Sequence, residues 1–416
     1  MKKKEELMNT NLSTIKEGSV EFYIHKIDKE AIPSKSMTVF YNKKMEINRD
    51  ISNIAICSYN RIYNKKPLII MDSMAASGIS SIRMLNECKN IKTIYINDIN
   101  PKAVDLINKN LLLNENINPS SHIEVSRKDA NYLFTEFTQN FYTKSNNSEE
   151  KPNVISIDPF GTPNLYVDAA FKAIQNKDGL LCITATDTAV LFGVRPKTCI
   201  RKYLSKSLHT EYCKEIGARI LVHFISRIAN VNKMGIIPLL TFYSSHFLRV
   251  FCLTFKNRDK ISQFFKKYGY IIHCNNCGHR FIFQDNILDI PDGCPLCMEA
   301  RKLIYAGPLW IGDLHDLKFI DDMVALNDEL QYSNKKRINK LLELIKEEIN
   351  KPISFYNIHK LSRILKISNL PKLDVLINFI REKGYIASRT HFDFLSIKTN
   401  MDINTIKETL LELKNN

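Results

Sequence analysis

The chain has 416 residues, a formal net charge of +15 and a pI near 9.2. This length holds two or three domains, each with a core of its own, and the positive charge favours a polyanionic partner such as nucleic acid. The N-terminus lacks the apolar core of a signal peptide, and no apolar run is long enough to span a bilayer. We therefore expect a cytoplasmic protein with no membrane partner.

From about residue 51 onward, predicted strands alternate with predicted helices along the chain. We interpret residues 1–50 as an N-terminal arm that leads into a first domain at 51–255. In this domain apolar strand-like runs alternate with helical patterns, which predicts an α/β fold. The polar segment from Thr138 to Pro152 is typical of an exposed loop.

Three of the predicted strands are followed by acidic residues. They are residues 68–71 before Asp72, 93–97 before Asp98, and 123–125 before Asp129 and Ala130. Strand, small-residue loop, helix and strand is the order of a nucleotide-binding half, whose ligand lies at the carboxyl ends of the strands. We therefore expect Asp98 to accept hydrogen bonds from both ribose hydroxyls of a nucleoside, and the third strand end to contact its adenine.

The loop that joins the first strand to its helix indicates which nucleoside binds. Residues 72–80 contain one glycine, Gly78, and so lack the G-x-G-x-x-G pattern. Glycines in that pattern let a pyrophosphate approach the backbone amides. A nucleoside without phosphates needs less of this, and S-adenosylmethionine is such a ligand. We therefore interpret this domain as that of a methyltransferase; the alternative is a Rossmann-like domain with no cofactor.

A fourth acid, Asp158, follows the apolar strand 154–157 and begins the turn Asp158-Pro159-Phe160-Gly161. The proline stiffens the turn, and the glycine lets the backbone approach a ligand. A carboxylate, a carbonyl and an aromatic face together suit a planar base with an exocyclic amine. The alternative is an ordinary Asp-Pro turn at a strand end.

A basic segment follows the next predicted strand, at 180–184. Between residues 195 and 206 it has no acid, and it contains Arg195, Lys197, Arg201, Lys202, Tyr203 and Lys206. Its place after a strand end puts it on the ligand side of the sheet, where it can hold a phosphate backbone. The alternative is a solvated basic helix.

Four of the ten cysteines form two Cys-x-x-Cys pairs separated by sixteen residues. This spacing is typical of a four-thiolate zinc site, with two ligands from each tight turn. We predict a closed structural Zn²⁺ site in a module at 271–300, with ligands Cys274, Cys277, Cys294 and Cys297. A redox pair or chance spacing is the alternative.

Beyond this module the pattern changes to helices with short strands. Helical spacing of apolar residues is found at 338–349, 358–365, 373–380 and 403–413, and a strand is predicted at 384–387. We interpret residues 256–416 as a C-terminal α+β domain with a winged-helix-like part, a fold that binds nucleic acid or serves as scaffold.

Several motifs, in this order, resemble the tRNA guanine-26 N2-dimethyltransferases, and the archaeal type in particular. The resemblance runs from about Phe40 to Thr399 and rests on residues 40–42, 48–50, 72–80, 97–99, 158–161, 184–189, 199–203, 307–312 and 388–392. It implies a Rossmann-like class I methyltransferase domain joined to a C-terminal domain that binds tRNA.

The resemblance also implies which residues bind S-adenosylmethionine. Carried over by position, these are Arg49, Asp98, Asp129 and Ala130, with Asp72, Ser77, Gly78 and Ser80 in the cofactor loop. The family commonly has an arginine where this chain has Ser80, which removes a charged contact to the cofactor. Arg83, one helical turn further along, is a candidate to replace it.

The implied reaction methylates the exocyclic N2 of guanine, first to N2-methylguanosine and then to N2,N2-dimethylguanosine. Asp158, Pro159 and Phe160 would form the catalytic turn, and Arg195, Lys197, Arg201, Lys202 and Tyr203 would contact tRNA. We expect a monomer. Two alternatives stay open, an amino-methyltransferase that acts on another nucleic acid and a non-catalytic zinc-ribbon, winged-helix protein.

Overall fold

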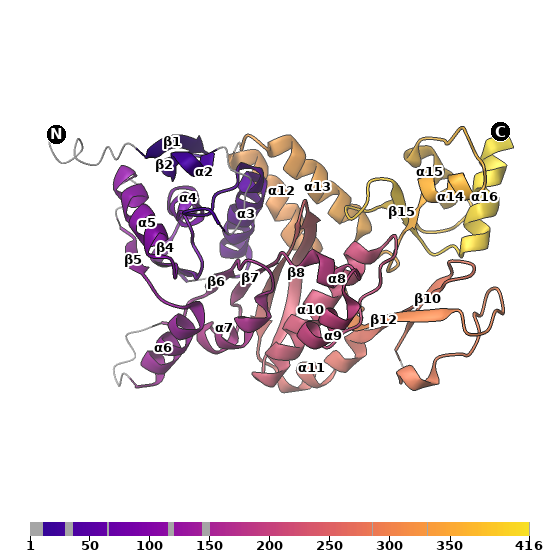
Figure 1. Ribbon diagram of the computed structural model, residues 1–416, viewed down its shortest axis with the longest axis horizontal. Helices are drawn as coiled ribbons and strands as arrows, with labels where there is room; N and C mark the ends of the chain where they lie inside the picture. Colours follow the sequence, from indigo (N-terminus) through magenta and orange to yellow (C-terminus); the bar gives the residue numbers. More distant parts are fainter. Residues whose placement is uncertain are drawn as a thin grey trace. The chain divides into compact units, whose positions relative to one another are not determined.

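The chain folds into two units that are not consecutive in sequence. The computed structural model describes residues 11–29, 36–64, 66–114, 120–143, 150–284, 286–330 and 332–415 (Figure 1). Unit 1 comprises Met1–Thr184, Phe251–Lys256 and Asp321–Asn339, and unit 2 comprises Ala185–Val250, Asn257–Ile320 and Lys340–Asn416. This division differs from the predicted boundaries because most of the segment between 185 and 255 packs in unit 2, and because residues 321–339 return to unit 1.

A seven-stranded sheet with the order β5-β4-β3-β6-β7-β9-β8 forms the centre of the fold. The strands are β3 (Leu68–Asp72), β4 (Ile91–Asn97), β5 (His122–Ser126), β6 (Val154–Ile157), β7 (Leu180–Ala185), β8 (Gly235–Ser244) and β9 (Phe247–Phe255). The first five pair in parallel. A two-residue turn joins β8 to β9, and such a turn requires antiparallel strands, so the sheet is mixed. The sequence analysis found the five parallel strands and missed this hairpin.

Helices alternate with the parallel strands, as a βαβ pattern requires. In unit 1 they are α3 (Glu46–Ile62), α4 (Ile79–Glu87), α5 (Pro101–Leu113), α6 (Ala130–Thr143) and α7 (Val167–Ala173). Helix α6 overlaps the segment predicted to be an exposed loop. Phe134 and Phe137 are buried at helical spacing, and this burial carries the helix on to Thr143; residues 144–149 lie outside the described residues.

The predicted N-terminal arm contains a β-hairpin, β1 (Leu12–Glu17) and β2 (Val20–His25), followed by the short helix α2 (Lys26–Lys29). Alternate residues of β2, from Val20 to Ile24, are buried and pack against Ile79 and Ile82 of α4. The hairpin is therefore part of the core of unit 1, because it covers the apolar side of α4.

A buried charge cluster lies beside this hairpin, and we call it the Arg83 cluster. The side chain of Arg83 is 0% exposed, and its guanidinium donates to Glu17 at 2.9 Å, Asp50 at 2.6 Å and Glu87 at 3.0 Å. Residues far along the chain complete the cluster. The Tyr332 hydroxyl donates to Glu87 at 2.6 Å, and the Asn334 amide donates to Asp50 at 3.0 Å.

Besides β8 and the first part of β9, unit 2 contains helices and two small sheets. The order β11-β10-β12 is antiparallel, and a second three-stranded sheet has the order β13-β15-β14. The strands are β10 (Tyr268–Cys274), β11 (Arg280–Phe283), β12 (Leu303–Trp310), β13 (Tyr356–Asn357), β14 (Ala387–Arg389) and β15 (Ser396–Thr399). The helices of the second half of the chain, two of which cross between units, are α8 (Thr188–Leu191), α9 (Pro196–Tyr203), α10 (Cys213–Val231), α11 (Arg258–Ser262), α12 (Leu317–Leu330), α13 (Lys335–Glu348), α14 (Ile358–Ile364), α15 (Leu373–Glu382) and α16 (Ile403–Asn415). Among the described residues, no helix is both long and apolar enough to cross a membrane.

The Arg83 cluster generates a stability prediction. Replacing Arg83 by Met removes the arginine that Asp50 and Glu87 share and one of the two arginines that bind Glu17, so we expect the free energy of unfolding to fall by about 3–5 kcal/mol. Urea denaturation measures the change. Arg61→Met is the matched control, because Arg61 is 44% exposed where it pairs with Glu329 and should cost about 0–1 kcal/mol. Equal, small losses in the two variants would contradict this account of the cluster.

Candidate active site

Four acidic residues lie at one edge of the sheet. Asp72 is the last residue of β3, Asp98 follows β4, Asp129 follows β5 by a short loop, and Asp158 follows β6. Asp72 pairs in register with Ile96 and Ser156 on the neighbouring strands. Because these strands are parallel, their carboxyl ends meet at the same edge, where the ligands of such sheets bind.

Asp98 is held by backbone amides. Its carboxylate accepts hydrogen bonds from the amides of Ala76 at 2.8 Å and Asn100 at 2.9 Å, and each accepting oxygen keeps a lone pair for a ligand. The orientation of this carboxylate is therefore fixed by the backbone, and its predicted contact with a ribose stays a prediction.

Asn97, which the sequence analysis did not assign to the site, joins the loops of this edge. It is 0% exposed, and its amide donates to the carbonyls of Ser73 at 3.0 Å and Lys128 at 2.9 Å. Its carbonyl accepts from Ser126 at 2.8 Å and from the Lys128 amide at 3.0 Å. A polar residue inside an apolar strand, directly before Asp98, is the signal in the sequence that could have identified it.

The predicted cofactor loop is closely packed. Asp72 accepts a hydrogen bond from the Ser81 hydroxyl at 2.7 Å, and the carbonyl of Ser77 accepts one from Asn110 at 2.9 Å. Gly78 precedes α4 with φ +75, and a Cβ there would lie 3.0 Å from Ile107. Only glycine fits this backbone without strain. Ser80, on the first turn of α4, is half-buried.

Asp129 and Ala130 start α6. The carboxylate of Asp129 is exposed and accepts from the amides of Asn131 at 2.9 Å and Tyr132 at 3.3 Å, while Ala130 is buried. Capping the helix is a sufficient structural reason for an aspartate at this position. Its place on the third strand end also agrees with the predicted contact to adenine, which stays a prediction.

The turn after β6 presents a carboxylate and an aromatic ring together. Asp158 is exposed, Pro159 is buried, and Phe160 is 49% exposed. The ring of Phe160 meets that of Phe40 edge to face, with centroids 4.9 Å apart, and Gly161 adopts φ +97. An exposed acceptor next to a braced aromatic face can bind an amine-bearing base.

Two arginines of unit 1 are held in ion pairs. Arg49, on α3, donates to both carboxylate oxygens of Glu17 at 2.6 Å. Among the described residues, every guanidinium contact of Arg83 lies within the buried Arg83 cluster, so Arg83 is not oriented to replace the arginine that the resemblance leads one to expect at Ser80. Sequence could not show this, since the direction of a helical side chain depends on distant partners.

The basic segment forms α9 and the residues around it. Arg195, Lys197 and Arg201 are exposed. Lys202 and Tyr203 instead bind Asp187, at 3.0 Å through the ammonium and 2.8 Å through the hydroxyl. The side chain of Tyr203 is 0% exposed and belongs to the core, so its ring is not available to a stacked base.

The four predicted metal-binding cysteines come together at the end of β10. The sulfurs of Cys274 and Cys297 are 3.7 Å apart, as are those of Cys277 and Cys294. All four lie within 4.8 Å of one another, and none forms a disulfide. A tetrahedral zinc site with Zn–S bonds of about 2.3 Å has sulfurs about 3.8 Å apart, so the arrangement fits this metal.

A second group of potential metal ligands, His315, Glu348 and His391, lies buried in unit 2. Glu348 already accepts hydrogen bonds from His391 and from Thr390. Lys398 and Arg219, both buried, balance the charges of Glu348 and Glu215. A divalent cation would add charge that nothing here compensates, so we interpret the group as a structural ion-pair network.

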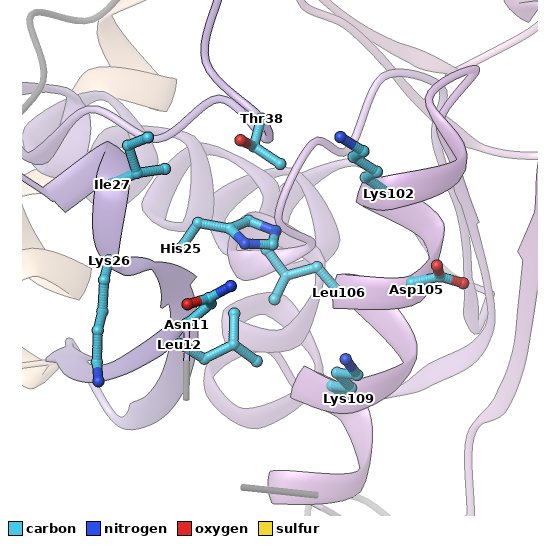
Figure 2. Close-up of a pocket in the computed structure, with 10 residues that line it drawn as sticks. All are labelled: Asn11, Leu12, His25, Lys26, Ile27, Thr38, Lys102, Asp105, Leu106 and Lys109. Carbon is cyan, nitrogen blue, oxygen red and sulfur yellow. The ribbon is translucent and has the colours of Figure 1, made fainter. Parts of the chain in front are cut away.

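Unit 1 also contains a cavity of about 470 Å³ between the hairpin and α5. Figure 2 shows the imidazole of His25 pointing into it. It contains none of the predicted cofactor residues; its lining residues are Asn11, Leu12, His25, Lys26, Ile27, Thr38, Lys102, Asp105, Leu106 and Lys109.

Comparisons with known proteins agree with this geometry. Residues 18–411 match the model of the family described as N2,N2-dimethylguanosine tRNA methyltransferase. A relative from Methanosphaera stadtmanae named tRNA (guanine(26)-N(2))-dimethyltransferase is 36% identical, and the match covers 98% of each chain. A relative of the same name from Methanobrevibacter smithii is 35% identical over 97% of this chain and 98% of its own.

The fold agrees with a solved structure over nearly its whole length. The structure of Trm1 from Pyrococcus horikoshii in complex with S-adenosyl-L-methionine matches with a TM-score of 0.79 and 31% identity. The match covers 96% of this chain and 100% of that one. The motifs, the edge of acidic residues and these matches lead to one conclusion: the chain belongs to the N2,N2-dimethylguanosine tRNA methyltransferase family.

Proposed function

We propose that this protein transfers methyl groups from S-adenosylmethionine to the exocyclic N2 of guanine 26 in tRNA, giving N2,N2-dimethylguanosine through N2-methylguanosine. The observation that carries the proposal is the edge of the parallel sheet, where Asp98 is fixed by two backbone amides and Asp158 stands beside Phe160. The names of the relatives and the S-adenosylmethionine complex of the solved relative support it.

The cofactor residues at successive strand ends contact different parts of the nucleoside. Asp98 binds the ribose hydroxyls, and Asp129 and Ala130 bind the adenine. The loop from Asp72 through Ser77, Gly78 and Ser80 lies against the methionine part, for which Arg49 supplies the charge. Bound there, S-adenosylmethionine supplies a methyl group already activated on a sulfonium.

The residues of the turn align the guanine amine. N2 of guanine is a weak nucleophile, because its lone pair is delocalised into the ring. Asp158 accepts an N–H bond from this amine, which returns electron density to nitrogen, and then takes the proton that is released. Phe160 fixes the plane of the ring, so that the amine stands in line with the methyl group. No covalent intermediate is needed.

The tRNA is held outside the turn. Guanine 26 must leave its stack to reach Asp158, as bases do in other base-modifying enzymes. Arg195, Lys197 and Arg201, exposed on and beside α9, bind the phosphate backbone, and Lys202 is oriented for the same purpose by Asp187. The helices and three-stranded sheet of residues 356–415 form the winged-helix-like part that binds tRNA by shape.

The four cysteines bind one structural zinc ion. Four thiolates leave no open coordination position, so the ion stabilises and does not catalyse. Cys277 and Leu296, from the two turns, pack against the apolar core of α14, α15 and α16. The zinc therefore fixes the β10–β12 sheet to the C-terminal helices.

The catalytic assignment is tested by Asp158→Asn. We expect the turnover number to fall roughly 10²- to 10⁴-fold, because the amine loses its proton acceptor. The measurement uses unmodified tRNA transcripts and labelled S-adenosylmethionine, with mass spectrometry of the nucleosides. Asp168→Asn, an exposed acid paired with Lys172 on α7, is the control and should retain activity. Full activity of Asp158→Asn, or a methylated base other than guanine 26, would contradict the proposal.

The RNA-binding assignment is tested by replacing Arg195, Lys197 and Arg201 with Gln. We expect weaker tRNA binding. The slope of log Kd against log salt concentration should become shallower by roughly two to three, because each lost phosphate contact releases about one counterion fewer. Lys102→Gln with Lys109→Gln removes two positive charges at the cavity of unit 1 and serves as the control, compared per charge removed. An equal change in the control would mean that net charge, rather than α9, determines binding.

The zinc assignment is tested by elemental analysis of the purified protein. We expect one zinc per chain in the wild type and its loss in Cys294→Ser, together with a lower melting temperature, because metal binding contributes directly to folding. Cys57→Ser changes a thiol far from the cluster in sequence and should keep the metal. A wild-type protein that folds with zinc supplied but carries none would refute the assignment.

A further inference from the structure

Glu17, the last residue of β1, accepts more hydrogen bonds than a carboxylate needs for an ordinary ion pair. Arg49 donates to it from Nε and from Nη2, both at 2.6 Å. Arg83 donates at 2.9 Å and the Tyr41 hydroxyl at 3.2 Å. The side chain of Glu17 is 1% exposed. Burial raises its pKa, but Arg49 and Arg83 outweigh burial and hold the pKa below its usual range.

In this arrangement one nitrogen of Arg49 makes no hydrogen bond to any of the described residues. Nε and Nη2 both bind Glu17, and Nη2 also donates to the carbonyl of Asn42 at 3.2 Å. Within the described part of the chain, Nη1 makes no hydrogen bond. The Arg49 side chain is 12% exposed, so a ligand can still reach it. An arginine bound side-on in this way keeps the N–H groups of Nη1 for a second carboxylate.

We propose that Glu17 is a positioning residue for the cofactor: it fixes the guanidinium of Arg49 so that Nη1 binds the carboxylate of the methionine part of S-adenosylmethionine. The inference rests on the proposed cofactor role of Arg49. Ser80 carries no charge, which makes this orientation more important for the carboxylate. Arg83 donates to the same oxygen of Glu17 that accepts from Nε of Arg49, and thereby ties the cofactor arginine to α4 and to the N-terminal hairpin.

Two ligands separate this role from a purely structural one. S-adenosylhomocysteine has the methionine-derived carboxylate, whereas 5′-methylthioadenosine has the same adenosine and sulfur without it. For Glu17→Gln we expect S-adenosylhomocysteine affinity to fall about 10-fold, because one amide oxygen cannot accept from both nitrogens of Arg49 and from Arg83. The affinity for 5′-methylthioadenosine should change by less than about twofold, since the adenosine contacts are kept. Isothermal titration of the full chain measures both.

Equal losses for the two ligands, or no loss for either, would overturn the inference. Arg49→Met tests the premise separately. If Arg49→Met weakens both ligands equally, the proposed cofactor role of Arg49 fails. If it weakens only S-adenosylhomocysteine while Glu17→Gln does not, the positioning role of Glu17 fails.

Glu17→Asp keeps the test decisive if Glu17→Gln does not fold. It retains the charge that Arg83 requires, but it withdraws the carboxylate by one methylene from Arg49. We expect a smaller loss that is again confined to S-adenosylhomocysteine, with the KM for tRNA unchanged. A Glu17→Asp protein with wild-type affinity for both ligands and a lower melting temperature would show a structural role only.

Discussion

The parallel pairing of β3 with β4 and β6 is the constraint on which the rest of the structure depends. It brings Asp72, Asp98 and Asp158, which are far apart in the sequence, to one edge of one sheet. The single buried side chain of Asn97, at the end of β4, then forms hydrogen bonds to Ser73 after β3, to Ser126 at the end of β5 and to Lys128 just after it. The pairing of the strands therefore determines where the candidate site lies, and side-chain hydrogen bonds fix the loops around it.

The geometry also matches the demands of the reaction. A weak nucleophile must be closely aligned with the methyl group that it attacks, so rigid supports complement the proton acceptor proposed at Asp158. Backbone amides hold Asp98, a proline precedes Phe160, and Phe40 braces its ring. Parts that do not move on binding lose little entropy when the reactants come together.

Much of this site could be predicted from the sequence, because buried parallel strands are short apolar runs with clear ends. Strand β6 lies at the predicted residues, and Asp158 follows it as expected. The direction of Arg83 could not be predicted, since its partners Glu17 and Asp50 are 66 and 33 residues away in the sequence. The burial of Tyr203 could not be predicted for a similar reason: a basic stretch does not reveal which of its residues face the core. The hairpin β1–β2 was missed because its burial depends on α4.

The discontinuity of unit 1 has a consequence for how the protein is made. Residues 251–256 and 321–339 complete this unit, and Tyr332 and Asn334 supply the last donors to Glu87 and Asp50. Domains usually fold in order as they leave the ribosome, with the N-terminal one first. Here the unit that begins at the N-terminus stays incomplete until about four fifths of the chain has been synthesised, with unit 2 partly made in the meantime. Until then Glu87 and Asp50 lack the donors of Tyr332 and Asn334, so the buried charge cluster of unit 1 is completed only after part of unit 2 has been synthesised.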